Sequence, residues 1–127
     1  MMKGITKRPI IGITMGDPVG IGPEIILKAL AKRSVYETCR PLVLGDVAVM
    51  TATNQRLGIA LGIRLVDAPE AGLYQSESID LVSLSDLDSS QLRHGQPTQE
   101  TGRAMVAYVT HGADWAMKGR IQGLTTC

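Results

Sequence analysis

Short apolar runs alternate with polar and glycine-rich stretches along this chain. The runs at 9–15 and 41–46 are almost continuously apolar, which is typical of strands buried on both faces of a parallel sheet. Shorter runs at 63–66 and 121–126 and a weakly alternating run at 79–84 predict three further strands. Four of the five predicted strands end at a glycine, aspartate or serine, where a turn is favoured.

Between these strands, apolar residues recur at helical spacing. Helices are predicted at 25–33 and 47–57, the second ending at Gly58, and the strongest begins at Thr98 and ends near Lys118. Thr98 is a suitable N-cap for that long helix, and Gly58 is a suitable C-terminal stop.

Strands and helices therefore alternate, with one strand-to-strand step before the long helix. This order predicts an α/β fold with a mostly parallel sheet and flanking helices. Residues 1–8 are expected to form an N-terminal extension, and 9–127 the N-terminal part of one α/β domain that is incomplete at the C-terminus.

Composition narrows the function. The 127 residues carry 13 Lys+Arg and 12 Asp+Glu, a net charge of +1, with three Tyr, one Trp and no Phe. Without a basic surface or aromatic platforms, nucleic-acid binding is not expected. No apolar run is long enough to span a membrane. Cys39 and Cys127 lie far apart without a C-x-x-C motif, which favours a reducing, cytoplasmic location.

The loop at 16–24 is the sharpest candidate site. It holds three glycines and two prolines, follows a buried strand and leads into a helix. Glycines allow a ligand to approach closely, and the helix N-terminus favours an anion. The spacing matches neither the dinucleotide motif G-x-G-x-x-G nor a Walker A loop. A tight turn without a ligand is the alternative interpretation.

Four other polar or small positions have plainer interpretations. Asp46 follows the second strand and either faces the same edge as Asp17 or caps the next helix. His94 and His111 lack the neighbours of a metal site and are expected at the surface or at a cap. Gly102 is expected to let the long helix pack closely on the sheet.

Residues 16–24 fit the pattern G-D-P-x-G-I-G-P-E. This resembles the opening motif of the 4-hydroxythreonine-4-phosphate dehydrogenase family. The resemblance continues at 41–46, at 95–108, which is similar to the family's G-x-x-[ST]…G-x-x-A…Y helix, and at 123–127, which is similar to the strand before its P-[IVL]-x-K loop. It covers nearly the whole chain from residue 9 onward.

The resemblance implies a homodimeric, cytoplasmic enzyme with a fold like isocitrate and isopropylmalate dehydrogenases. Such an enzyme uses NAD (or NADP) to oxidise 4-phosphooxy-L-threonine, with decarboxylation, in pyridoxal 5'-phosphate biosynthesis. A divalent metal (Zn, Mg or Co) held by histidines polarises the small phosphorylated hydroxy acid.

The family's metal histidines, substrate-binding His-Thr pair and phosphate ligands lie beyond residue 127, so no catalytic or metal residue is carried over. Asp17, Gly20 and Gly22 are expected to line the cofactor or substrate cleft. Two alternatives remain: a dehydrogenase of another four-carbon acid phosphate (threonate or erythronate 4-phosphate), and a non-catalytic α/β module that binds an anion or a protein.

Overall fold

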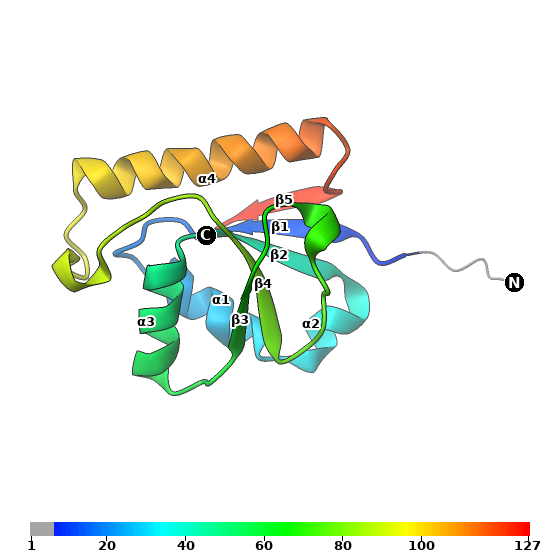
Figure 1. Ribbon diagram of the computed structural model, residues 1–127, viewed down its shortest axis with the longest axis horizontal. Coiled ribbons are helices and arrows are strands. Elements are labelled where there is room, and N and C mark those ends of the chain that lie inside the picture. The colour runs from blue at the N-terminus through cyan, green and yellow to red at the C-terminus, as the bar shows by residue number, and fades with distance from the viewer. Residues whose placement is uncertain (1–6) are drawn as a thin grey trace, which may run out of the picture.

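The centre of the molecule is a parallel sheet of five strands, seen in a computed structural model that describes residues 7–127 (Figure 1). The strand order is β3-β4-β2-β1-β5, and all four neighbouring pairs are parallel. The strands are β1 (Ile10–Thr14), β2 (Arg40–Gly45), β3 (Gly62–Leu65), β4 (Ser78–Ser83) and β5 (Gly123–Thr126). The predicted α/β fold with a parallel sheet is confirmed, and residues 1–6 of the predicted extension lie outside the described residues.

Helices cover both faces of this sheet. The long helix α4 lies along one face, against β1, β2 and β5, and the three shorter helices lie on the other (Figure 1). The helices are α1 (Gly22–Leu30), α2 (Arg33–Thr38), α3 (Val47–Leu57) and α4 (Gln99–Met117). Two single 3-10 turns, Pro69–Ala71 and Ser89–Gln91, lie in the connections on either side of β4.

Chain connectivity brings distant segments to one edge of the sheet. The connection from β4 through α4 passes over β2 and β1 to reach β5. Because all strands are parallel, their carboxyl ends lie at the same edge, together with residue 127 and the 16–24 loop (Figure 1). In open parallel sheets this edge is where ligands bind.

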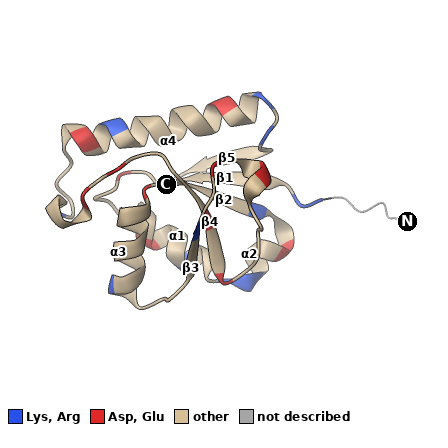
Figure 2. Ribbon diagram, viewed as in Figure 1, with Lys and Arg blue, Asp and Glu red and all other residues tan. Residues whose placement is uncertain are grey.

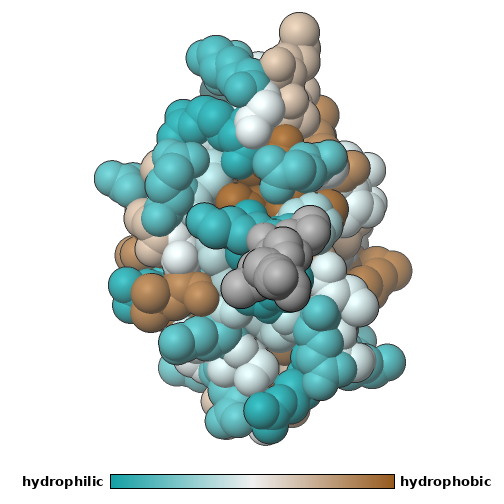
Figure 3. All heavy atoms as spheres, turned by 90° about the vertical axis from the view of Figure 1, so that its right-hand side faces the viewer, coloured by the Kyte–Doolittle hydropathy of each residue, from teal (hydrophilic) through white to brown (hydrophobic). Residues whose placement is uncertain are grey.

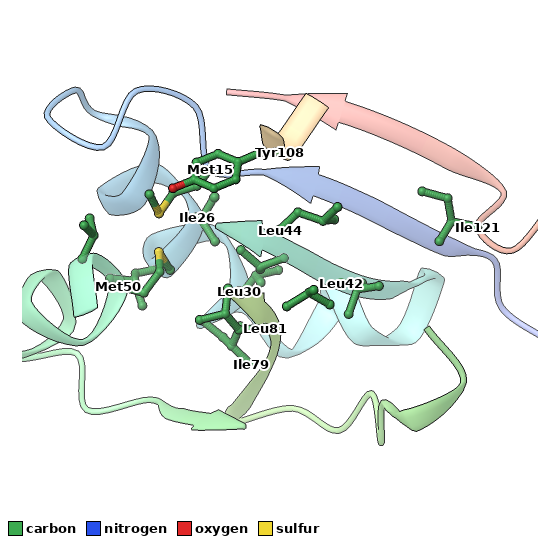
Figure 4. Packing of buried hydrophobic residues seen from close by; sticks show 14 of the residues in the cluster. Met15, Ile26, Leu30, Leu42, Leu44, Met50, Ile79, Leu81, Tyr108 and Ile121 are labelled. Atoms are coloured by element: carbon green, nitrogen blue, oxygen red, sulfur yellow. The ribbon is translucent and has the colours of Figure 1, made fainter. Parts of the chain in front are cut away.

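The core is aliphatic, as a sequence without phenylalanine requires (Figure 4). The central strand β2 is its driest part, since Leu42, Val43 and Leu44 are all completely buried. Tyr108 from α4 is completely buried too, and lies beside Met15 above the sheet (Figure 4). Each such side chain contributes about 1.5–3 kcal/mol by leaving water.

Helix α4 begins as predicted. Thr98 and Thr101 form a reciprocal capping box, in which each side chain accepts a hydrogen bond from the other's backbone N–H. The interpretation of Gly102 is wrong, because a side chain there would meet open space. Gly112 is the glycine that allows close packing, since a Cβ there would collide with Leu124 of β5.

Helix α2 is an element that the sequence pattern did not predict. Lys32 is extended and separates α2 from α1, where a single helix was predicted to end at residue 33. Tyr36 is buried, and its hydroxyl donates to the backbone carbonyl of Ser78 at 3.3 Å. Arg8 also donates to the carbonyl of Tyr36. These long-range contacts hold a six-residue helix that would be marginal by itself.

Charged side chains of both signs are interspersed over the ribbon (Figure 2). The face that carries the amino ends of the strands is mainly hydrophilic, with apolar side chains in separate small areas (Figure 3). Among the described residues, no helix combines the length and the hydrophobicity needed to span a membrane.

Candidate functional site

The 16–24 loop crosses the carboxyl edge of the sheet between β1 and α1. Gly16 has a φ of 75°, a conformation that favours glycine. The loop then turns at Asp17, whose carboxylate accepts from the backbone N–H of Val19 at 3.0 Å and whose carbonyl accepts from Gly20 at 2.9 Å. The backbone carbonyl of Val19 accepts from Gly95 at 2.8 Å, so the β4–α4 connection is tied to the loop.

The three predicted cleft residues have different surroundings. Gly20 lines a cavity beside the loop. Asp17 is half-buried, and its carboxylate is engaged in the turn just described. Gly22 is buried at the start of α1, where a Cβ would collide with the carbonyl of Met15. The structure thus gives Asp17 and Gly22 roles in shaping the loop, and their roles toward a ligand stay predictions.

Backbone donors at the start of α1 are free. Within residues 7–127, the N–H groups of Ile21, Gly22 and Glu24 donate no hydrogen bond, and no side chain caps the helix. Such groups at a helix N-terminus, together with the helix dipole, favour an anion.

The cavity beside the loop has a volume of about 260 Å³. Three segments far apart in the sequence form its walls: the loop and first turn of α1, the side of α3 that carries Val49, Thr53 and Arg56, and the β4–α4 connection. Its lining includes Gly20, Pro23, Glu24, Thr53, Arg56 and His94. Sequence reasoning missed Arg56, because nothing in the pattern of 47–57 shows which side of the helix faces this loop.

Opposite charges meet at the cavity wall. Lys28 donates to the Glu24 carboxylate at 2.9 Å, and the Arg56 guanidinium lies 3.8 Å from it. The hydrogen bond from Lys28 and its charge, assisted by Arg56, hold the pKa of Glu24 below its usual value. Glu24 therefore remains an anion at neutral pH, and its charge complements the positive end of the helix.

Asp46, after β2, is closed off from solvent. Its completely buried carboxylate accepts from the backbone N–H of Val49 at 3.1 Å, from that of Leu87 at 2.9 Å and from the Ser85 hydroxyl at 2.8 Å. It thus caps α3, as one of its two interpretations predicted, and also holds the β4–α4 connection in place.

Tyr108 completes this polar cluster. Its hydroxyl lies 2.6 Å from the Ser85 hydroxyl, whose single hydrogen is given to Asp46, so Tyr108 is the donor in that contact. Burial raises the pKa of Tyr108 to about 12, although the hydrogen bond with Ser85 opposes the rise. The cluster is an uncharged hydroxyl pair ending on a carboxylate, with no group free for a ligand.

The two histidines lie apart. His94 is exposed at the cavity rim, whereas His111 contacts the Trp115 ring edge-on at 4.5 Å between ring centres. No cluster of three or more His, Cys, Asp or Glu side chains in residues 7–127 is arranged to hold a metal ion. The described residues therefore do not fit a divalent metal site.

A parallel α/β sheet with a glycine-rich loop and an open helix N-terminus at its carboxyl edge defines a class of ligand-binding α/β proteins. Within that class, residues 37–127 match the family model described as "Pyridoxal phosphate biosynthetic protein PdxA". The chain belongs to this family.

Curated relatives agree with this assignment. The chain is 51% identical over 121 residues to a 4-hydroxythreonine-4-phosphate dehydrogenase of Desulforapulum autotrophicum, covering 95% of this chain and 36% of that protein. It is 41% identical over 119 residues to a protein of Symbiobacterium thermophilum that is provisionally named a D-threonate 4-phosphate dehydrogenase, covering 94% and 36%. The chain thus spans about a third of the length of these relatives.

Solved structures show the same fold. A 4-hydroxythreonine-4-phosphate dehydrogenase from Burkholderia phymatum superposes with a TM-score of 0.89 at 36% identity, over 95% of this chain and 36% of that one. A counterpart from Klebsiella pneumoniae gives a TM-score of 0.85 at 26% identity, over 94% and 36%.

Proposed function

We propose that this chain is the N-terminal part of an NAD-dependent (or NADP-dependent) dehydrogenase that oxidises 4-phosphooxy-L-threonine, with decarboxylation, in pyridoxal 5'-phosphate biosynthesis. The observation that carries the proposal is the 51% identity over 121 residues to a 4-hydroxythreonine-4-phosphate dehydrogenase. The complete protein acts as a cytoplasmic homodimer on a small phosphorylated hydroxy acid, with no nucleic acid or membrane partner.

The chain's own contribution is to bind and orient an anionic ligand. Free N–H groups at Ile21, Gly22 and Glu24 are suited to a phosphate group. Gly20 lines the cavity and has no side chain, so a ligand can approach the backbone there. We assign Asp17, Gly20 and Gly22 to the cofactor or substrate cleft, the first and last as residues that shape the loop.

A nicotinamide cofactor, when bound, accepts the hydride. Residues 7–127 contain no group of side chains arranged to hold the divalent metal that is expected for the family. The other residues needed for the reaction belong to the remaining length of the relatives, of which this chain covers 36%.

A second candidate is a dehydrogenase of D-threonate or erythronate 4-phosphate. It is favoured by the 41% identity to the provisionally named D-threonate 4-phosphate dehydrogenase. The two candidates share the phosphate and the hydroxyl that is oxidised, and they differ in the group carried beside that hydroxyl.

One experiment separates these candidates and the non-catalytic alternative. The intact mass of the protein from its own cells is measured first, and that protein is then assayed for reduction of NAD and NADP with each acid phosphate. We expect a mass well above 13.6 kDa and a kcat/KM for 4-phosphooxy-L-threonine at least about tenfold above that for D-threonate 4-phosphate. The reverse preference establishes the second candidate. A mass near 13.6 kDa without activity overturns both dehydrogenase candidates for this chain and favours the non-catalytic alternative.

A further inference from the structure

One buried carboxylate holds two of the three walls of the cavity beside the glycine-rich loop. Asp46 accepts a hydrogen bond from the backbone N–H of Val49 at 3.1 Å, and Val49 lines the cavity from α3. Asp46 also accepts from the backbone N–H of Leu87 at 2.9 Å, in the β4–α4 connection that forms a second wall through His94 and its neighbours. This connection runs beside α3 on its way to α4 (Figure 1). Asp46 therefore sets how these two walls lie relative to one another.

The third wall, which is the loop itself, is fastened to the same connection. The backbone N–H of Gly95 donates to the carbonyl of Val19 at 2.8 Å, and Val19 lines the cavity beside Gly20. Gly95 has a φ of 76° there, a conformation that favours glycine. The connection is thus held by Asp46 at Leu87 and by the loop at Gly95. A shift at the first contact changes the position of the second.

Tyr108 fixes the direction of the hydrogen bonds behind these walls. Ser85 has one hydroxyl hydrogen, which it gives to Asp46 at 2.8 Å, and the Tyr108 hydroxyl donates to Ser85 at 2.6 Å. Hydroxyl groups in such a chain polarise one another, so the donor from Tyr108 strengthens the bond from Ser85 to Asp46. Asp46 and Tyr108 are completely buried within residues 7–127, so these contacts do not depend on what covers the outside of the molecule.

We propose that Asp46, Ser85 and Tyr108 are positioning residues for the cavity. They touch no ligand themselves, and they hold α3 and the β4–α4 connection at the separation that a ligand between them requires. The ligand is expected to carry a phosphate, as both the hydroxy acid and the nicotinamide cofactor do, and this expectation rests on the proposed function. Losing the Tyr108 hydroxyl leaves the lining of the cavity intact but lets its walls move, so ligand binding weakens while the chemical step is preserved.

Tyr74 provides a matched comparison at the amino edge of the sheet. It is buried, and its hydroxyl donates to the carbonyl of Pro69 at 2.6 Å, the same distance as between Tyr108 and Ser85. The guanidinium of Arg40, the first residue of β2, lies 5.6 Å from the centre of its ring. Neither Tyr74 nor these two neighbours line the cavity. A purely structural role for Tyr108 therefore predicts that Tyr108→Phe and Tyr74→Phe behave alike.

Amide hydrogen exchange tests whether the walls are held as proposed. It is measured by NMR on the protein at the length that its own cells make, without ligand. In Tyr108→Phe, the amide hydrogens of Leu87 and Gly95 should exchange about three- to tenfold faster, because one hydrogen bond of the chain that holds the connection is lost. In Tyr74→Phe they should exchange within about twofold of their rates in the unchanged protein. Circular dichroism checks that both variants are folded.

Steady-state kinetics test the consequence for the ligand. Tyr108→Phe should raise the KM for 4-phosphooxy-L-threonine, or that for NAD, about three- to tenfold, and should leave kcat within about twofold. The compound whose KM rises is the one that occupies the cavity. Ser85→Ala should repeat the effect, whereas Ser85→Thr, which keeps a hydroxyl, should leave KM near its original value. Tyr74→Phe should change neither constant, and a mere loss of folded protein would lower kcat without raising KM.

Three results would overturn the proposal. One is an unchanged exchange rate at Gly95 in Tyr108→Phe, another is an equal change in Tyr74→Phe, and the third is a kcat that falls while both KM values stay constant. A protein that reduces neither NAD nor NADP overturns the proposed function instead. Exchange at Gly95 then still decides whether Tyr108 holds the cavity walls through Ser85 and Asp46.

Discussion

Two segments at the carboxyl edge of the sheet differ in whether their polar groups are hydrogen-bonded within the protein. After β2, Asp46 is completely buried and accepts three hydrogen bonds that tie α3 to the β4–α4 connection. After β1, the N–H groups of Ile21, Gly22 and Glu24 at the start of α1 have no partner among the described residues, and Glu24 lines an open cavity. Both segments follow a buried strand and start a helix.

The difference separates structural from ligand-binding chemistry. A buried polar group without a partner costs about 1–3 kcal/mol, so the satisfied Asp46 cluster is a necessity of the fold. Unpaired donors cost little at the exposed Ile21 and the half-buried Glu24, because water satisfies them until an anion replaces it.

The largest expected effect is the loss of stability at alkaline pH, and it concerns the three buried tyrosines. Tyr36, Tyr74 and Tyr108 are buried, and burial raises the pKa of each to about 12 from the usual 10.0. The fold thus favours the protonated form. Its stabilising contribution is complete below pH 10 and is lost as the pH rises through about 12.

We therefore expect cooperative unfolding between pH 10 and 12. Tyrosinate absorbance should rise in the same step as the loss of helical circular dichroism. Absorbance that rises fully near pH 10 while the helices persist would show that these tyrosines are not enclosed as described.

Removing the two aspartates compares the closed and open segments directly. Asp46→Ala leaves the N–H groups of Val49 and Leu87 buried without an acceptor and removes the cap of α3, so the free energy of unfolding should fall by about 3 kcal/mol. Asp17→Ala loses one hydrogen bond, to Val19, and should cost about 1 kcal/mol or less. Urea denaturation measures both, and equal losses would contradict the contrast.

Two glycine-to-alanine changes probe close packing. Gly22→Ala forces a methyl group against the Met15 carbonyl and should destabilise by about 1–3 kcal/mol. Gly102→Ala meets open space inside α4 and should stabilise by about 0.5–1 kcal/mol, because alanine favours the helix. The opposite signs should appear as opposite shifts in the thermal midpoint. A loss at both positions would contradict the open space around Gly102.

The smallest effect is expected at Thr14, the last residue of β1. Its Oγ1 is buried without a hydrogen-bond partner among the described residues. Thr14→Val should therefore be neutral or stabilise by about 0.5 kcal/mol. The matched control is Thr53→Val, since the buried Thr53 hydroxyl donates to the Val49 carbonyl at 2.8 Å and should lose about 1 kcal/mol. A clear loss at Thr14 in urea denaturation would reveal a partner for its hydroxyl.

Local signals predicted most elements of the fold. The helix over 47–57 was correct at both ends, because the Asp46 cap and the left-handed Gly58 act within a few residues of sequence. The start of α4 was correct for the same reason. Helix α2 was missed, because contacts from Arg8 and Ser78, distant in the sequence, hold it in place.

Part of the candidate site could likewise be predicted from local sequence, and part could not. The loop over 16–24 and its open helix N-terminus could be predicted, since glycine, proline and the preceding apolar run lie together in the sequence. The cavity beside it could not, because Arg56 and His94 reach it from α3 and from the β4–α4 connection. Likewise, nothing local distinguished the open Gly102 from the packed Gly112.

The sequence by itself thus determined the alternation of strands and helices, their caps and the position of the glycine-rich loop. These depend on periodicity and on contacts between residues a few positions apart. Only the tertiary structure decided the strand order, the burial of Asp46 against Ser85 and Leu87, and the residues that share the cavity with Gly20. These features depend on which segments, distant in the sequence, bury apolar area against one another and which strands pair in the sheet.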